Sequence, residues 1–266
     1  MKRTIAILCL LLTSLSHTYA QQQRWAFTAA VGPSIPVGKF GSRNPYDSLA
    51  AFAKTGPTVE LTASYHIRRT WGISVLMGGE EHGVATKTIV SKLEAANPGD
   101  RYSYSSDPWI FAKLMAGVFG EWPLGGGHWV LTGNLYIGAV QTKLPKTSMS
   151  GATTQTDSLS GGYSTFSYYK NIGTIRVGLA IQGGAGVRYL LDKHWFVEAR
   201  FSYGSAWYRA DGAATSFLHS QGPTGIPAGS SYYGGTGTVQ TGTTGPTHYT
   251  QPLSTISGVV GAGIRI

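Results

Sequence analysis

The sequence predicts an all-β protein, an eight-stranded antiparallel up-and-down transmembrane β-barrel. Eight segments alternate apolar and polar side chains with a period of two, and the connections between them alternate between short and long. Charged residues make up only 12% of the 266 residues, whereas the chain has 37 glycines and 15 tyrosines. Alternation of this kind is typical of strands, and ordinary soluble domains carry about 25% charged residues. So little charge favours a barrel whose outer face meets lipid.

The N-terminus has the three parts of a secretory signal peptide. A basic start at Lys2 and Arg3 precedes the apolar run Ile5–Leu12, and small residues follow before Gln21. A membrane-spanning helix would need about 20 apolar residues, so the run is too short to be one. We therefore expect residues 1–20 to be a cleaved signal peptide and residues 21–266 to form one barrel domain.

The mature chain lacks the residues of several common sites. The one cysteine, Cys9, lies inside the signal peptide, which excludes a disulfide scaffold and a Cys-ligated metal site. His219 and His248 lack the spacing of zinc ligands, and no HExxH pattern occurs. We predict no metal and no cofactor.

The mature chain is basic, with 19 Lys and Arg against 12 Asp and Glu, a net charge of +7. These residues are scattered, and no nucleic-acid-binding motif accompanies them, so a nucleic-acid partner is not expected. Anionic lipid headgroups or surface glycans fit the positive charge better.

The first expected strand, Arg24–Val31, precedes a segment with two prolines, Gly32–Phe40. The prolines indicate an edge-like strand end that leaves the sheet before a polar loop to about Gly56. The segment does not fit a phosphate-binding loop, because five residues rather than four separate Gly32 from the Gly-Lys pair, and Phe40 follows the lysine.

Three hairpins then repeat one design, in which two alternating strands meet at a turn of a few residues. The strands are expected at Thr58–Arg68 and Trp71–His82, at Ile110–Trp122 and Trp129–Ile137, and at Ile175–Leu191 and Trp195–Tyr203. Long polar connections follow each hairpin, at about Ala85–Pro108, Pro145–Thr174 and Gly212–Leu253. No segment has an apolar period that favours a helix, so α/β enzyme folds are poorly supported. The last connection carries no Asp, Glu, Lys or Arg, and the sequence does not reveal its role.

The final strand, Ser254–Ile266, is expected to close the barrel on the first. Its apolar face is marked by Ile256, Val260, Ile264 and Ile266, and its other face is small or charged. A strand that ends a sheet needs a partner, and Arg24–Val31 supplies one.

Alternation alone does not distinguish a soluble lipocalin-like barrel, apolar inside, from an outer-membrane barrel, apolar outside. Tryptophans beside the short turns predict an interfacial aromatic girdle: Trp71, Trp122, Trp129 and Trp195. The opposite faces carry both signs of charge and predict a paired lumen network: Glu60, Glu80, Glu121 and Glu198 with Lys113, Arg176, Arg188 and Arg200. These features, with short periplasmic turns and long extracellular loops, favour the membrane barrel.

The signal peptide, the eight strands, the segment Gly32–Phe40 and the closing GVVGAGIRI resemble the small OmpA/OmpX-type outer-membrane barrels, especially the porin-family barrels of Bacteroidetes-like bacteria. The resemblance covers the whole mature chain. It implies an outer-membrane location, surrounding lipid and the outer-membrane assembly machinery as partners. Family members usually end on an outward aromatic residue, whereas Ile266 keeps the apolar position and lacks the ring.

The predicted function is a structural or adhesion-type barrel with a side-chain-plugged lumen that presents surface loops, and not an enzyme. A surface ligand or partner protein would be reached through the extracellular loops. Two alternatives stay open. One is a lipid-modifying barrel enzyme, for which Glu80-Glu81-His82 near the outer rim offers a histidine beside a carboxylate. The other is a narrow porin-like channel, which eight strands disfavour because their interior is just wide enough for side chains.

Overall fold

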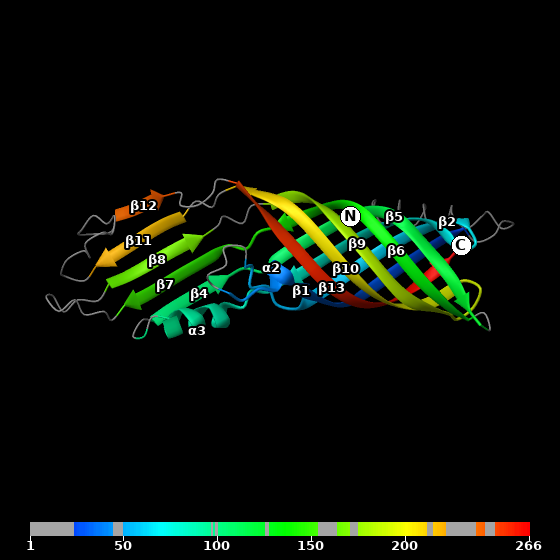
Figure 1. The fold of residues 1–266 in the computed structure, drawn as a ribbon, viewed down its shortest axis with the longest axis horizontal. Coiled ribbons are helices and arrows are strands. Elements are labelled where there is room, and N and C mark those ends of the chain that lie inside the picture. Colours follow the sequence, from blue (N-terminus) through cyan, green and yellow to red (C-terminus); the bar gives the residue numbers. More distant parts are fainter. Residues whose placement is uncertain are drawn as a thin grey trace, which may run out of the picture.

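The structure is a computed structural model that describes residues 24–44, 50–96, 98, 101–125, 128–153, 164–170, 175–211, 215–221, 238–242 and 248–266. The expected signal peptide, residues 1–20, lies outside the described residues, as does most of the uncharged connection Gly212–Leu253. Figure 1 shows a barrel whose strands run obliquely, with a second sheet extending from one of its ends.

Eight antiparallel strands close the barrel in the order β1-β13-β10-β9-β6-β5-β3-β2. Their bounds are β1 Trp25–Val37, β2 Gly56–Arg68, β3 Trp71–His82, β5 Trp109–Leu124, β6 Trp129–Lys143, β9 Ile175–Leu190, β10 Trp195–Asp211 and β13 His248–Arg265. The first and last strands pair from Ala26 opposite Arg265 to Val37 opposite Ser254. The predicted eight-stranded antiparallel barrel is confirmed.

The apolar side chains face outwards. Leu135 on β6 is 56% exposed and Val260 on β13 is 66% exposed, whereas Glu60 and Glu198 inside are 1% and 5% exposed. The inward positions are therefore polar and the outward positions apolar, which is the pattern of a membrane barrel. The lipocalin-like alternative requires the reverse and is excluded.

Two expectations about strand ends were wrong. β1 continues through both prolines to Val37, and β13 begins at His248 rather than Ser254. Pro33 lies opposite Pro57 of β2, and Pro36 lies opposite Thr255 of β13. The longer strands carry the barrel wall beyond its apolar band and towards the second sheet.

The long connections hold regular structure that the sequence pattern did not predict. They contain α3 Thr86–Ala96, β4 Arg101–Ser106, β7 Thr147–Thr153, β8 Ser164–Lys170, β11 Thr215–Gln221 and β12 Thr238–Gly242. The strands form a five-stranded sheet in the order β12-β11-β8-β7-β4 (Figure 1). Their Ser, Thr and Tyr content suits strands but shows no apolar alternation. No helix among the described residues is long and apolar enough to cross a membrane.

A short helical turn, α2 Gly38–Gly41, lies at the end of the barrel that carries the long connections, here called the loop end. Gly38 has φ +59°, a left-handed conformation that favours glycine. The turn places Phe40 in full burial, with its ring 5.6 Å from that of Trp109 and 5.5 Å from that of Phe111. Phe40 is thus the centre of an aromatic cluster at the loop end of the barrel.

At the opposite, short-turn end, close packing makes Gly263 on β13 intolerant of a side chain. A Cβ atom there would lie 2.2 Å from Cζ of Phe196 and 2.5 Å from the backbone oxygen of Phe27. We expect Gly263→Ala to lower the free energy of unfolding by about 1–3 kcal/mol, because overpacking forces the neighbours to shift. Denaturant titration of the folded barrel would measure it. Gly125→Ala is the matched control, since no atom lies within 4 Å of its added Cβ. Equal stability of the two variants would contradict the packing argument.

Candidate functional site

The barrel interior holds a continuous chain of ion pairs and hydrogen bonds, here called the lumen network. Alternation places its members on the inward faces of β2, β3, β5, β9, β10 and β13. The network contains Glu60, His66, Glu80, His82, Lys113, Glu121, Gln182, Arg188, Glu198, Arg200 and Arg265.

The short-turn end of the network is centred on Glu121. Its carboxylate accepts a bond from Nη1 of Arg188 and a 2.7 Å bond from Nη2 of Arg265, and Nε2 of His66 lies 3.4 Å away. The Arg188 guanidinium also stacks over the buried Phe196 ring, 4.0 Å from its centroid. The Arg265 guanidinium lies over the same ring at 5.9 Å, so one carboxylate holds two guanidiniums that both face an aromatic ring.

The middle of the network alternates carboxylates and guanidiniums. Oε2 of Glu198 accepts bonds of 3.1 Å and 2.7 Å from Nε and Nη2 of Arg188. Its other oxygen, Oε1, accepts a 3.1 Å bond from Nη1 of Arg200. Nη2 of Arg200 then donates to Oε2 of Glu60. These side chains are nearly fully buried, so each charge depends on the next for compensation.

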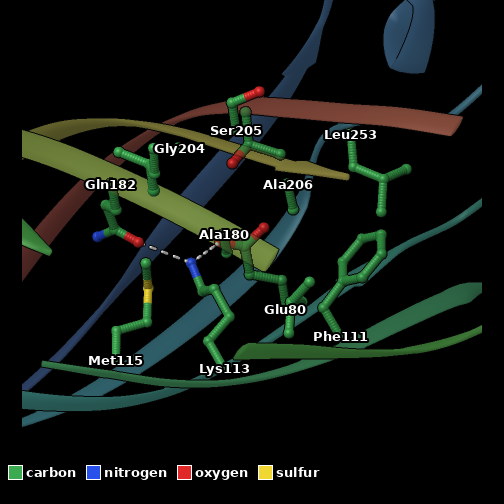
Figure 2. A pocket seen from close by; sticks show the side chains of 13 residues that line it. Glu80, Phe111, Lys113, Met115, Ala180, Gln182, Gly204, Ser205, Ala206 and Leu253 are labelled. Carbon is green, nitrogen blue, oxygen red and sulfur yellow. Dashed lines mark hydrogen bonds and ion pairs between the residues drawn. The ribbon is translucent and has the colours of Figure 1, made fainter. Parts of the chain in front are cut away.

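Gln182 connects the middle to the loop end. Its Nε2 donates to Oε1 of Glu60 over 2.9 Å, and its Oε1 accepts a 3.0 Å bond from Nζ of Lys113. Lys113 also donates to Oε1 of Glu80 over 2.5 Å. Figure 2 shows the Lys113 ammonium between Gln182 and Glu80. An amide suits this position because it can donate to a carboxylate and accept from an ammonium at once.

His82 ends the network and is completely buried. Its Nε2 lies 3.2 Å from Oε2 of Glu80, and its Nδ1 lies 2.9 Å from the backbone oxygen of Lys54. The Phe40 ring meets the imidazole edge-on at 5.2 Å. The histidine that the enzyme alternative placed near the outer rim is therefore enclosed rather than exposed at the rim. The two ring nitrogens face the Glu80 carboxylate and a backbone oxygen, an arrangement that does not set the imidazole against a nucleophile.

A small cavity of about 30 Å³ adjoins the loop end of the network. Lys113, Gln182, Glu80, Ser205 and Thr255 are its polar lining residues. The others are Gly204 and apolar residues: Phe111, Met115, Val140, Ala180, Ile181, Ala206 and Leu253. Figure 2 shows Phe111, Met115 and Leu253 around this space. A cavity of this size holds about one or two water molecules. It is too small for an organic substrate.

The predicted lumen residues fall into two groups. Glu60, Glu80, Lys113, Glu121, Arg188, Glu198 and Arg200 lie together in the lumen network. Arg176 lies outside the network, further towards the loop end, where it is paired across from Thr142 of β6. The fourth cation of the network, with Lys113, Arg188 and Arg200, is Arg265 instead. Sequence reasoning missed Arg265, Gln182, His66 and His82 as members. All four stand on the polar face of their strands, so the alternation of apolar and polar residues could have predicted that they face the lumen.

The predicted girdle tryptophans lie on the outer wall beside the short turns, with exposed fractions of 42% for Trp71, 52% for Trp122, 51% for Trp129 and 52% for Trp195. Trp25 joins them on β1, with its ring 5.0 Å from that of Tyr65. On the closing strand, Ile256, Val260 and Ile266 are exposed, and Ile264 is half-buried.

Among the residues that the structure describes, no group of three or more His, Cys, Asp or Glu side chains is placed to hold a metal ion. The histidines of the lumen network each face a single carboxylate, Glu121 or Glu80. The described interior is thus characterised by carboxylates paired with arginine and lysine side chains.

The fold and its interior define a class: a small transmembrane β-barrel of the OmpA/OmpX type, with eight strands, an apolar exterior and side chains inside. The sequence matches no protein-family model, and no curated protein matches it significantly.

Several solved outer-membrane barrels are similar in structure. Ail, the attachment invasion locus protein of Yersinia pestis, is 11% identical, with 92% of this chain and 100% of that chain covered and a TM-score of 0.40. OprG from Pseudomonas aeruginosa is 11% identical, with 92% and 97% covered and a TM-score of 0.40. Neisserial surface protein A is 12% identical, with 91% and 97% covered and a TM-score of 0.35. Likeness at this level carries no information on what this chain binds.

Proposed function

We propose that the protein is an outer-membrane barrel that anchors a surface-presented β-sheet, acting in adhesion or envelope integrity, with a lumen plugged by its own side chains. The observation that carries the proposal is the lumen network. It runs from Glu121 near the short turns to His82 beneath Phe40, so charged side chains occupy the route that a solute would take. Four carboxylates meet four cations along it, which favours a permanent plug over an ion path.

The five-stranded sheet supports the surface role. Its strands continue from the loop end of the barrel, and α3 packs beside β4 at one edge (Figure 1). At the other edge, β12 pairs with β11 on one side, and no described strand pairs with its second side. An edge strand presents backbone N–H and C=O groups that an extended segment of another protein can pair with. The partner class that fits is therefore a protein with an extended segment.

Export and assembly complete the proposal. Residues 1–20 act as the signal peptide, and the outer-membrane assembly machinery inserts the barrel through its closing strand. Cell fractionation, heat-modifiable migration on SDS gels and protease treatment of whole cells test it together. We expect the protein in the outer-membrane fraction, with cleavage only in the connections at the loop end. Recovery from the periplasm, or conversion of lipid A by the purified protein, would contradict it.

A plugged lumen predicts that the barrel does not conduct ions. Reconstituted in planar bilayers, the folded protein should show no steady conductance, because side chains fill an eight-stranded interior. Lys113→Ala shortens a side chain beside the existing cavity. This variant should show at most brief conductance steps, because the Glu60–Arg200 pair still fills the lumen between Lys113 and the short-turn end. Large, stable single-channel steps from the unmodified protein would favour the narrow-channel alternative.

The anchoring role predicts that part of the outer sheet can be removed without loss of the barrel. Asp211 of β10 lies opposite His248 of β13, so Asn-Gly in place of residues 212–247 would join the two strands by a tight turn. We expect this variant to keep heat-modifiable migration and to lose binding to a surface ligand or partner protein. Failure to assemble would show that residues 212–247 are needed for the barrel itself.

A further inference from the structure

A groove of about 430 Å³ lies on the outer wall, where β1 runs between β13 and β2. Its floor is made by three alanines, Ala29, Ala63 and Ala262, with Thr28, Thr62 and Gly263 of the same strands. Bulky side chains line the rest: Phe27, Leu61, Val75, Met77, Trp195 and Ile264. Ala29 lies opposite Ala262, whereas the neighbouring outward pairs on these strands are large, with Val31 opposite Val260 and Phe27 opposite Ile264. The small Ala29–Ala262 pair, with Ala63 in the next row opposite Phe27, thus leaves a hollow between larger pairs on these strands.

Basic side chains flank the short-turn end of this groove. Arg24 directly precedes β1, and Lys193 lies in the turn directly before Trp195; both are exposed. Nη1 of Arg24 donates to the hydroxyl of Tyr65 over 3.1 Å, which holds the guanidinium beside the wall. A charged group at the end of the groove would therefore meet two cations.

The short turns are basic as a whole. Arg68 and Arg69 lie at the turn after β2, and Asp192 is the one carboxylate in the described residues of the three short turns. The carboxylate of Asp192 accepts bonds of 2.7 Å and 2.6 Å from the backbone N–H groups of Trp195 and His194. These bonds hold the pKa of Asp192 below its ordinary value and direct the carboxylate into its own turn. Arg24, Arg68, Arg69 and Lys193 thus outnumber the one carboxylate side chain of these turns, and basic side chains attract anionic headgroups.

We propose that the groove and its basic rim bind one anionic phospholipid, with an acyl chain along the alanine floor and the phosphate at Arg24 and Lys193. The site rests on the proposed function, because it needs the short-turn end to face the phospholipid leaflet of the outer membrane. An acyl chain in the hollow between Phe27, Trp195 and Met77 is contacted on several sides. On a convex stretch of the wall, the same acyl chain would be contacted on one side. The girdle tryptophans place the rim at headgroup level.

A second copy of the protein fits this surface less well. A two-fold interface brings the same patch of both copies together. Arg24 and Lys193 of each copy would then approach those of the other, and their like charges would repel. Phospholipid carries the opposite charge and the chain shape of the groove, so charge complementarity favours it.

Native mass spectrometry of barrels released from bilayers of phosphatidylethanolamine with phosphatidylglycerol tests the site. We expect one retained phosphatidylglycerol per barrel. Ala262→Phe and Ala29→Phe, which fill the groove from the lipid side, should each reduce retention at least tenfold. Ala139→Phe is the matched control, since Ala139 is also an exposed alanine and lies on β6, across the barrel from β1. Arg24→Gln with Lys193→Gln should remove the preference for phosphatidylglycerol over phosphatidylethanolamine, and inorganic phosphate should not compete.

The outcomes distinguish a failure of the lipid site from a failure of the proposed membrane-anchoring function. Heat-modifiable folding of each variant is measured alongside, so that a folding defect is not read as lost binding, and the charge variants leave the groove itself intact. Equal retention in Ala262→Phe and Ala139→Phe would overturn the site, as would a dimer that Ala262→Phe abolishes. Absence of the unmodified protein from bilayers would overturn the membrane-anchoring function, whereas normal insertion without retained lipid would overturn only the lipid site.

Discussion

Replacing Glu198 with glutamine is expected to lower the free energy of unfolding by about 3–5 kcal/mol, the cost of removing one partner from a buried ion pair. Glu198 receives three bonds from Arg188 and Arg200 and is 5% exposed. The neutral amide would leave two guanidiniums without their shared counter-charge and would turn its own N–H donors towards them. Urea titration of the folding equilibrium in detergent or bilayers measures the loss.

A double-mutant cycle with Arg188 tests whether the loss comes from the pair. Arg188→Gln removes one cation, and Glu121 keeps Arg265 and His66 as partners. We expect Glu198→Gln combined with Arg188→Gln to cost less than the sum of the single changes, because the two groups interact directly. Glu81→Gln, at an exposed carboxylate on β3, should change stability by no more than about 0.5 kcal/mol. Additive costs in the cycle would contradict an interacting pair.

The strands of the barrel wall and the direction of their side chains could be predicted from the sequence, because one physical rule determines them. In a strand, alternate side chains face opposite ways, so the alternation places Glu60, Glu121 and Glu198 on one face and Leu135 and Val260 on the other. The tryptophans and the short turns then indicate which face meets lipid. These inferences depend on each strand alone.

The partners inside the barrel could not be read in the same way. Whether Arg176 or Arg265 meets Glu121 depends on the stagger between strands, which alternation does not encode. The burial of His82 likewise depends on segments outside its own strand, because α2 places Phe40 against it and Lys54 lies at its Nδ1. The second sheet was missed because its strands are ordered by backbone pairing with one another, which leaves no apolar alternation in the sequence to predict them.

Replacing Leu135 with arginine is expected to lower the free energy of unfolding by about 2–4 kcal/mol, the cost of a charge on the lipid face near the bilayer midplane. Leu135 is 56% exposed on β6 and lies opposite Val118 and Gly183 on the neighbouring strands. On the same outward face, Trp129 stands six residues before it and the exposed Gln141 six residues after it. An arginine in the middle of this span cannot easily extend its guanidinium to either interface. Folding titrations into phospholipid vesicles measure the cost.

Leu124→Arg is the matched control, because it makes the same change at the edge of the apolar band. Leu124 is 45% exposed and lies directly opposite Trp129 at the short-turn end of the β5–β6 hairpin. An arginine there reaches the headgroups at once, and the expected cost falls to about 0–1 kcal/mol. In detergent micelles, which adapt to the protein, the difference between the two variants should shrink. If both variants were equally stable in bilayers, the outer face would not be crossing lipid at the height of Leu135, and the membrane-anchoring function would fail with it.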